Sequence, residues 1–179
     1  MLLRPEIEPQ LKIAEQLYPK ILEFVKEYDY FNHKLEAEVA EKITQKIAIL
    51  ANKAISEEDL TENRNPNDLE LLAFNFALPY TQKVKNISRD EATEIVKRIQ
   101  FISYDTYDSQ VVTKEFKENK HAICGMLAQG YFMEFLDLNF AHPNVYKLFQ
   151  RQKINGKWVE LSVEEIVTQL IDFQIDTNK

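Results

Sequence analysis

Apolar residues recur every three or four positions along most of this chain, the spacing that gathers them on one face of an α-helix. The pattern predicts helices over residues 5–28, 32–55, 68–84, 88–102 and 109–139, and a last helix that opens at Ser162. Pro9 suits only a first helical turn, and we expect Pro19 to kink the first helix or split it in two. The polar stretch over residues 56–68 is predicted to be a loop.

Two helix starts have a specific local signal. Ser88 and Glu91 have the spacing of a capping box, in which the serine oxygen accepts from one free amide and the glutamate reaches back to another. Ser162 and Glu165 repeat this spacing near the C-terminus. We therefore predict that helices begin directly after Ser88 and Ser162.

The sequence Ile-Asn-Gly-Lys over residues 154–157 is typical of a two-residue type I′ turn between two short strands. Counting outward from this turn places Lys153 opposite Trp158, a cation beside an indole ring. It also places Arg151 opposite Glu160, so opposite charges favour the same register. An isolated hairpin is marginally stable in water, so we expect this one to lie on the helices or to pair its free edge with something else.

These elements predict an all-α protein: a single-domain bundle of about six helices over residues 1–179 with one small C-terminal β-hairpin. The composition agrees, because 45% of the residues are hydrophobic and 28% are charged, which is the balance of a folded globular protein. Glycine occurs only 3 times, and so few helix-breaking residues favour long helices.

Charge and cysteine content narrow the function classes. With a net charge of −7, the chain as a whole repels a phosphate backbone, which argues against nucleic-acid binding. The single cysteine, Cys124, excludes an internal disulfide and favours a reducing compartment. Residues 1–10 show no apolar run typical of a signal peptide, and no stretch is apolar enough to span a membrane. We expect a cytoplasmic protein, and the many lysines, isoleucines and asparagines favour a bacterial one.

Two of the three glycines, Gly125 and Gly130, fall inside the helix predicted over residues 109–139. Each costs about 1 kcal/mol relative to alanine in a helix interior. Tight packing inside the fold explains such positions, and so does the close approach of a ligand or partner helix. We favour tight packing.

Catalytic motifs are scarce. The sequence has no glycine-rich phosphate loop, no Gly-x-Ser-x-Gly elbow and no paired cysteines, so we expect no cofactor. One group of residues at three-residue spacing is an exception: Glu115, Glu118, His121 and Cys124. Glu118-x-x-His121 matches one half of a di-iron carboxylate site, but no second Glu-x-x-His occurs. We favour the alternative that the glutamates are solvated and that Cys124 is a small core residue.

Two charged surfaces are candidate binding sites. The acidic segment consists of Glu57, Glu58, Asp59 and Glu62, and the basic hairpin surface consists of Arg151, Lys153, Lys157 and Trp158. Because convergent catalytic groups are lacking, we favour a non-catalytic protein-binding module of the immunity, antitoxin or adaptor type, whose partner is another protein. Two alternatives stay open: a metal-dependent enzyme that uses the Glu/His cluster and, with less support, a helical protein associated with nucleic acid. The sequence also leaves homo-oligomerisation open.

Overall fold

A computed structural model describes residues 3–31, 37–62, 69–101, 120–154 and 156–173 of the chain. The described residues are mostly helical and hold one two-stranded antiparallel sheet near the C-terminus, which confirms the predicted fold class. Backbone contacts divide the chain into two compact units. Unit 1 comprises Met1–Pro9, Thr81–Tyr104 and Cys124–Lys179, and unit 2 comprises Gln10–Tyr80 and Asp105–Ile123. A single domain over residues 1–179 stays a prediction.

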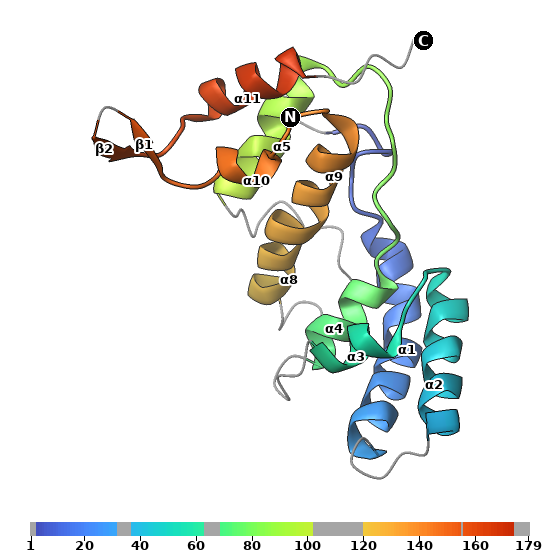
Figure 1. The fold of residues 1–179 in the computed structure, drawn as a ribbon. Coiled ribbons are helices and arrows are strands. Elements are labelled where there is room, and N and C mark those ends of the chain that lie inside the picture. Colours follow the sequence, from blue (N-terminus) through green and yellow to red (C-terminus); the bar gives the residue numbers. More distant parts are fainter. Residues whose placement is uncertain (1–2, 32–36, 63–68, 102–119, 155, 174–179) are drawn as a thin grey trace. The chain divides into compact units, whose positions relative to one another are not determined.

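Unit 2 is built around one long helix, α1 (Leu11–Phe31), which packs against α2 (Ala37–Ala51) and α4 (Leu69–Ala77) (Figure 1). A short helix, α3 (Glu57–Glu62), follows α2 and contacts it. The predicted apolar stripes form the core of this unit. Its buried side chains include Ala14, Tyr18, Ile21 and Val25 of α1, Ile43 and Ile47 of α2, and Leu72, Ala73 and Phe76 of α4.

Pro19 does not divide the first helix, contrary to what the sequence predicts. The helix begins at Leu11, after Pro9, and runs on through Pro19 without a break, so the predicted split is wrong. An interior proline costs about 3 kcal/mol, because it removes one helical hydrogen bond and crowds the preceding turn. Tyr18 and Ile21 on either side of it are buried, and burial of such side chains offsets a cost of that size.

The segment between α2 and α4 also corrects two predictions. Residues expected to form a loop include the helix α3, and the helix predicted to reach residue 84 ends at Ala77. It ends there because Pro79 disfavours helical geometry at Leu78. Tyr80, which the predicted helix would include, is 53% exposed, and its hydroxyl donates to the Ala54 carbonyl at 3.2 Å.

Unit 1 is built around α5 (Arg89–Gln100), which packs against α11 (Val163–Asp172) and the long central helix (Figure 1). That central helix runs through α8 (Lys120–Met126), the π-helical turn η2 (Leu127–Tyr131) and α9 (Phe132–Asn139), and unit 1 includes it from Cys124 onward. A short helix, α10 (Val145–Leu148), was not predicted. Buried core residues are Ala92, Ile95, Val96, Leu127, Phe132, Phe135, Leu136, Ile166, Val167 and Leu170.

Both capping boxes are confirmed. Ser88 caps α5, with its side chain accepting from the Glu91 amide and the Glu91 carboxylate accepting from the Ser88 amide. Ser162 and Glu165 make the same reciprocal pair at the start of α11. No helix in the described ranges combines the length and apolar character needed to cross a membrane.

The hairpin register is also confirmed. The strands β1 (Gln152–Ile154) and β2 (Lys157–Val159) are antiparallel, with Lys153 opposite Trp158. Gly156 has a φ of 81°, as the predicted turn requires, whereas Asn155 lies outside the described residues. The hairpin extends away from the helices of unit 1 (Figure 1), and every side chain of β2 is exposed. Of the two arrangements expected for the hairpin, the structure does not show packing on the helices, and pairing of its free edge with something else stays a prediction.

Candidate functional site

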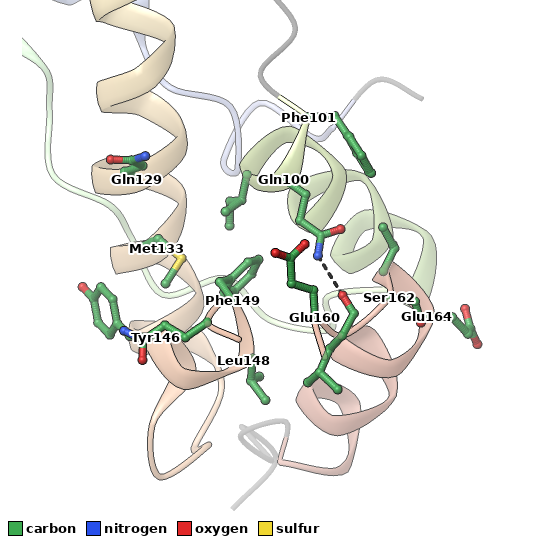
Figure 2. A pocket seen from close by; sticks show the side chains of 14 residues that line it. Gln100, Phe101, Gln129, Met133, Tyr146, Leu148, Phe149, Glu160, Ser162 and Glu164 are labelled. Carbon is green, nitrogen blue, oxygen red and sulfur yellow. Dashed lines mark hydrogen bonds between the residues drawn. The ribbon is translucent and has the colours of Figure 1, made fainter. Parts of the chain in front are cut away.

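An open groove lies in unit 1, and four stretches of chain that are distant in sequence line it (Figure 2). The groove has a volume of about 1210 Å³. Its walls are the C-terminal end of α5, the junction of η2 and α9, the residues of and after α10, and the connection from β2 into α11. Small-molecule sites in proteins are typically about 300–1,000 Å³, so this groove has room for a ligand of that class or for something larger.

Exposed aromatic rings mark two borders of this groove. Phe101, directly after α5, is 66% exposed, and Tyr146 of α10 is 48% exposed. Met133 and Phe149 add apolar surface to the lining between them (Figure 2). Large aromatic side chains are enriched where proteins meet partners, because they offer broad apolar area at little entropic cost.

Side-chain amides supply most of the neutral polar lining. Gln100 donates from Nε2 to the Leu161 carbonyl at 3.1 Å, which ties the end of α5 to the chain that enters α11 (Figure 2). Gln129 and Gln150 also line the groove and are exposed. A carboxamide both donates and accepts, so it can bind a peptide backbone without demanding a charge.

The π-helical turn η2 places Gln129 at this groove. Such turns insert one extra residue into a helix and occur frequently at functional sites. Gly130 lies in the same turn, and a Cβ atom built there would meet only the Met126 Cγ, at 4.0 Å; at Gly125 it would meet no described atom within 4 Å. Within the described structure, tight packing therefore does not explain either glycine, contrary to our expectation.

The acidic side chains beside the groove are paired. Glu160 accepts from Arg151 at 2.7 Å, as the predicted register requires, and Glu164 accepts from Arg89. All four side chains are largely exposed, so these ion pairs add little to folding stability. Their main effect is to leave this part of the groove close to neutral.

A buried ion cluster holds α5, and with it one wall of the groove, against the N-terminal segment. Arg98 is 7% exposed and makes two hydrogen bonds to Glu8, at 2.8 and 3.0 Å, and one to Glu94 at 2.9 Å. Arg4 binds Glu91 at 2.6 Å at the other end of α5. Burial acts to raise the pKa of Glu91, but hydrogen bonds from Arg4 and Ser88 outweigh it and hold this pKa below its ordinary value.

The hydroxyl of Tyr131 also joins the π-turn to the N-terminal segment. It lies 3.3 Å from the carbonyl oxygens of both Ile7 and Glu8, and the residue is buried. Burial, with the nearby Glu8 charge as a smaller cause, raises the pKa of Tyr131 to about 12.

This raised pKa predicts a loss of stability in alkali. Because the folded pKa lies above that of the unfolded chain, the stabilisation is complete below about pH 10 and declines as the pH rises toward 12. Relative to Tyr131→Phe, the wild type is expected to lose about 1 kcal/mol of unfolding free energy between pH 9 and 11. Urea unfolding of both proteins at each pH measures this difference, and a parallel decline in both would contradict it.

All four residues of the basic hairpin surface are exposed. Trp158 is 68% exposed, and Arg151, Lys153 and Lys157 are also exposed. No ion pair joins Lys153 or Lys157 to another residue of the described chain. Trp158 and Lys153 share one face of the strand pair and Lys157 is on the other, and neither lysine has an ion-pair partner among the described residues.

The acidic segment belongs to unit 2 and has a local structural role. Glu57, Glu58 and Asp59 form the first turn of α3 and are exposed, whereas the side chain of Glu62 lies outside the described residues. Asp59 accepts from both the amide and the hydroxyl of Ser56, at 2.8 Å each. Carboxylates at a helix N-terminus offset the helix dipole, so this cluster stabilises the start of a short helix.

Only part of the metal alternative falls within the structure. Glu115 and Glu118 lie outside the described residues, as does the side chain of His121, and Cys124 is buried at 3% exposure. Among the side chains that are described, no group of three or more His, Cys, Asp or Glu residues is placed to hold a metal ion. The Glu118–His121 site stays a prediction.

The groove was missed by sequence reasoning. Its residues, such as Phe101, Gln129 and Tyr146, share no spacing, and each comes from a different stretch of the chain. The only signal was indirect, because Gly130 is a glycine inside a predicted helix, and it lies beside Gln129 in the π-turn. The chain matches no protein-family model, and comparison with curated proteins and with solved structures gave no significant match.

Proposed function

We propose that this chain is a non-catalytic protein-binding module that contacts its partner through the hairpin and groove of unit 1. The observation that supports this most is the exposure of Trp158, 68%, on a hairpin that extends away from the helices. Two-stranded hairpins are marginal in water unless something covers them. Tryptophan is among the residues most enriched at the energetic centres of protein interfaces.

The groove supports the same function. Glu160 and Leu161, which line it, continue the chain directly from β2, so hairpin and groove are joined without an intervening element. Exposed Phe101 and Tyr146 extend the aromatic character of the hairpin along the groove. The chemistry of this lining is apolar rings, amides and paired charges, which suits recognition of a protein segment. An immunity, antitoxin or adaptor role in a bacterial cytoplasm is the setting we propose.

Quantitative affinity capture from a native lysate of the source cells tests this proposal. Trp158→Ser is expected to reduce capture of the principal partner at least about tenfold, because loss of a central aromatic anchor costs 2 kcal/mol or more. Ile49→Ser is the matched control, since Ile49 is 81% exposed on α2 of unit 2. Both variants should melt like the wild type. A partner set that is the same for all three proteins would overturn the proposal.

A further inference from the structure

The register of the hairpin determines which backbone groups point outward. The connection between the strands has two residues, so Ile154 and Lys157 form a hydrogen-bonded pair. Hydrogen-bonded and non-hydrogen-bonded pairs alternate along an antiparallel ladder, so the next pair, Lys153 and Trp158, points its amides and carbonyls away from the hairpin. Arg151 and Glu160 lie one residue beyond each strand, where their side chains form an ion pair at 2.7 Å, and continuing the same alternation points their backbone groups outward as well.

The two edges of the hairpin therefore differ in charge. The β1 edge presents the backbone of Arg151 and Lys153, and the β2 edge presents that of Trp158 and Glu160. Within the described chain, no backbone hydrogen bond uses the outward groups of Arg151 or Lys153. Since side chains alternate with period two, Arg151 and Lys153 also share one face of the hairpin.

We infer that the β1 edge binds an extended, acidic protein segment as a third, antiparallel strand. This inference rests on the proposed protein-binding function and specifies the partner. The partner residues opposite Arg151 and Lys153 are two positions apart, so their side chains fall on the same face as these two cations. Charge complementarity thus selects an acid-x-acid segment, with glutamate or aspartate at both outer positions.

Other occupants fit this edge less well. A second copy that paired its own β1 strand here would bring Lys153 and Arg151 against the same cations, and like charges directly opposite one another are destabilising. A nucleic-acid strand has no amide and carbonyl ladder to pair with the edge, and the chain carries a net charge of −7. The β2 edge disfavours an acidic strand, because Glu160 would face it.

Strand addition supplies both affinity and selectivity. Main-chain hydrogen bonds to the edge provide affinity, and the alternate side chains provide specificity. Arg151 already pairs with Glu160, so an incoming acid shares its guanidinium, whereas Lys153 has no ion-pair partner among the described residues. We therefore expect Lys153 to contribute more to selectivity than Arg151.

A fluorescent peptide, Thr-Thr-Glu-Val-Glu-Thr-Thr, tests this inference against the full chain. Binding is expected to weaken at least about tenfold when both glutamates are replaced by lysine, and equally when both glutamate amides are N-methylated, because methylation removes the strand hydrogen bonds. The variant Arg151→Glu/Lys153→Glu should lose binding to a similar degree. Lys12→Glu/Lys26→Glu, which changes the net charge equally on exposed positions of α1, should retain it.

Amide hydrogen exchange identifies the edge. The bound peptide is expected to protect the amides of Arg151 and Lys153 and to leave those of Trp158 and Glu160 unchanged. Protection of the β2 amides instead, equal binding of the N-methylated peptide, or equal binding of single-stranded DNA of similar length would each overturn the inference. If no peptide binds while capture of the partner still depends on Trp158, strand addition is wrong and the proposed function stands. If that dependence is absent too, both are wrong.

Discussion

Replacing Arg98 with methionine is expected to lower the free energy of unfolding by about 3–5 kcal/mol. The guanidinium is almost fully buried and makes three hydrogen bonds to Glu8 and Glu94, whose side chains are 16% and 20% exposed. Methionine keeps the apolar stem but leaves both carboxylates without their buried counter-charge. An uncompensated charge in a low-dielectric site costs more than the pair itself contributes.

Two further variants of the chain test the reason for this loss. Adding Glu8→Gln and Glu94→Gln to the Arg98 variant removes the stranded charges and should recover at least about half of the lost stability. Arg151→Met is the matched control, because its pair with Glu160 has side chains 71% and 66% exposed and contributes about 1 kcal/mol at most. Urea unfolding measures all of these. An Arg98 variant no less stable than the Arg151 control would show that the cluster does not hold α5 in place.

This buried cluster was only partly predictable from the sequence. Arg98 and Glu94 are one helical turn apart, so their pairing is visible in the sequence. Glu8 is 90 positions away from Arg98, and no local rule relates the two. The capping boxes at Ser88 and Ser162 were predicted correctly because all of their atoms belong to four consecutive residues.

The hairpin was predictable for the same reason. An Asn-Gly turn specifies its own register, so the positions of Arg151, Lys153 and Trp158 follow from counting. The groove was not predictable, because its walls meet only when α5, α9 and α11 pack together. The predicted effect of Pro19 was wrong because it rested on local helix propensity alone. In the folded chain, burial of the neighbouring side chains outweighs that propensity.

The second large effect is expected at Asn139, a buried residue at the end of α9. Its Oδ1 accepts from the Val84 amide at 2.7 Å, and its Nδ2 donates to the carbonyls of Gln82 and Phe135 at 3.0 and 2.9 Å. This one side chain therefore holds the segment before α5 in place, because it hydrogen-bonds to both a backbone donor and a backbone acceptor of that segment. A backbone donor or acceptor left unpaired in a partly buried position costs about 1–3 kcal/mol.

Asn139→Leu, which keeps the number and branching of the side-chain heavy atoms, should therefore lower the free energy of unfolding by about 2–4 kcal/mol, since it leaves both the Val84 amide and the Gln82 carbonyl unpaired. The exposed Asn75 of α4 offers a control, and Asn75→Leu should change stability by less than about 0.5 kcal/mol. Hydrogen exchange adds a local readout. The Val84 amide should exchange faster in Asn139→Leu but stay protected in Asn139→Asp, because aspartate keeps the accepting oxygen and loses only the donors. Equal protection of Val84 in the leucine variant would show that other contacts, and not Asn139, hold this segment beside α9.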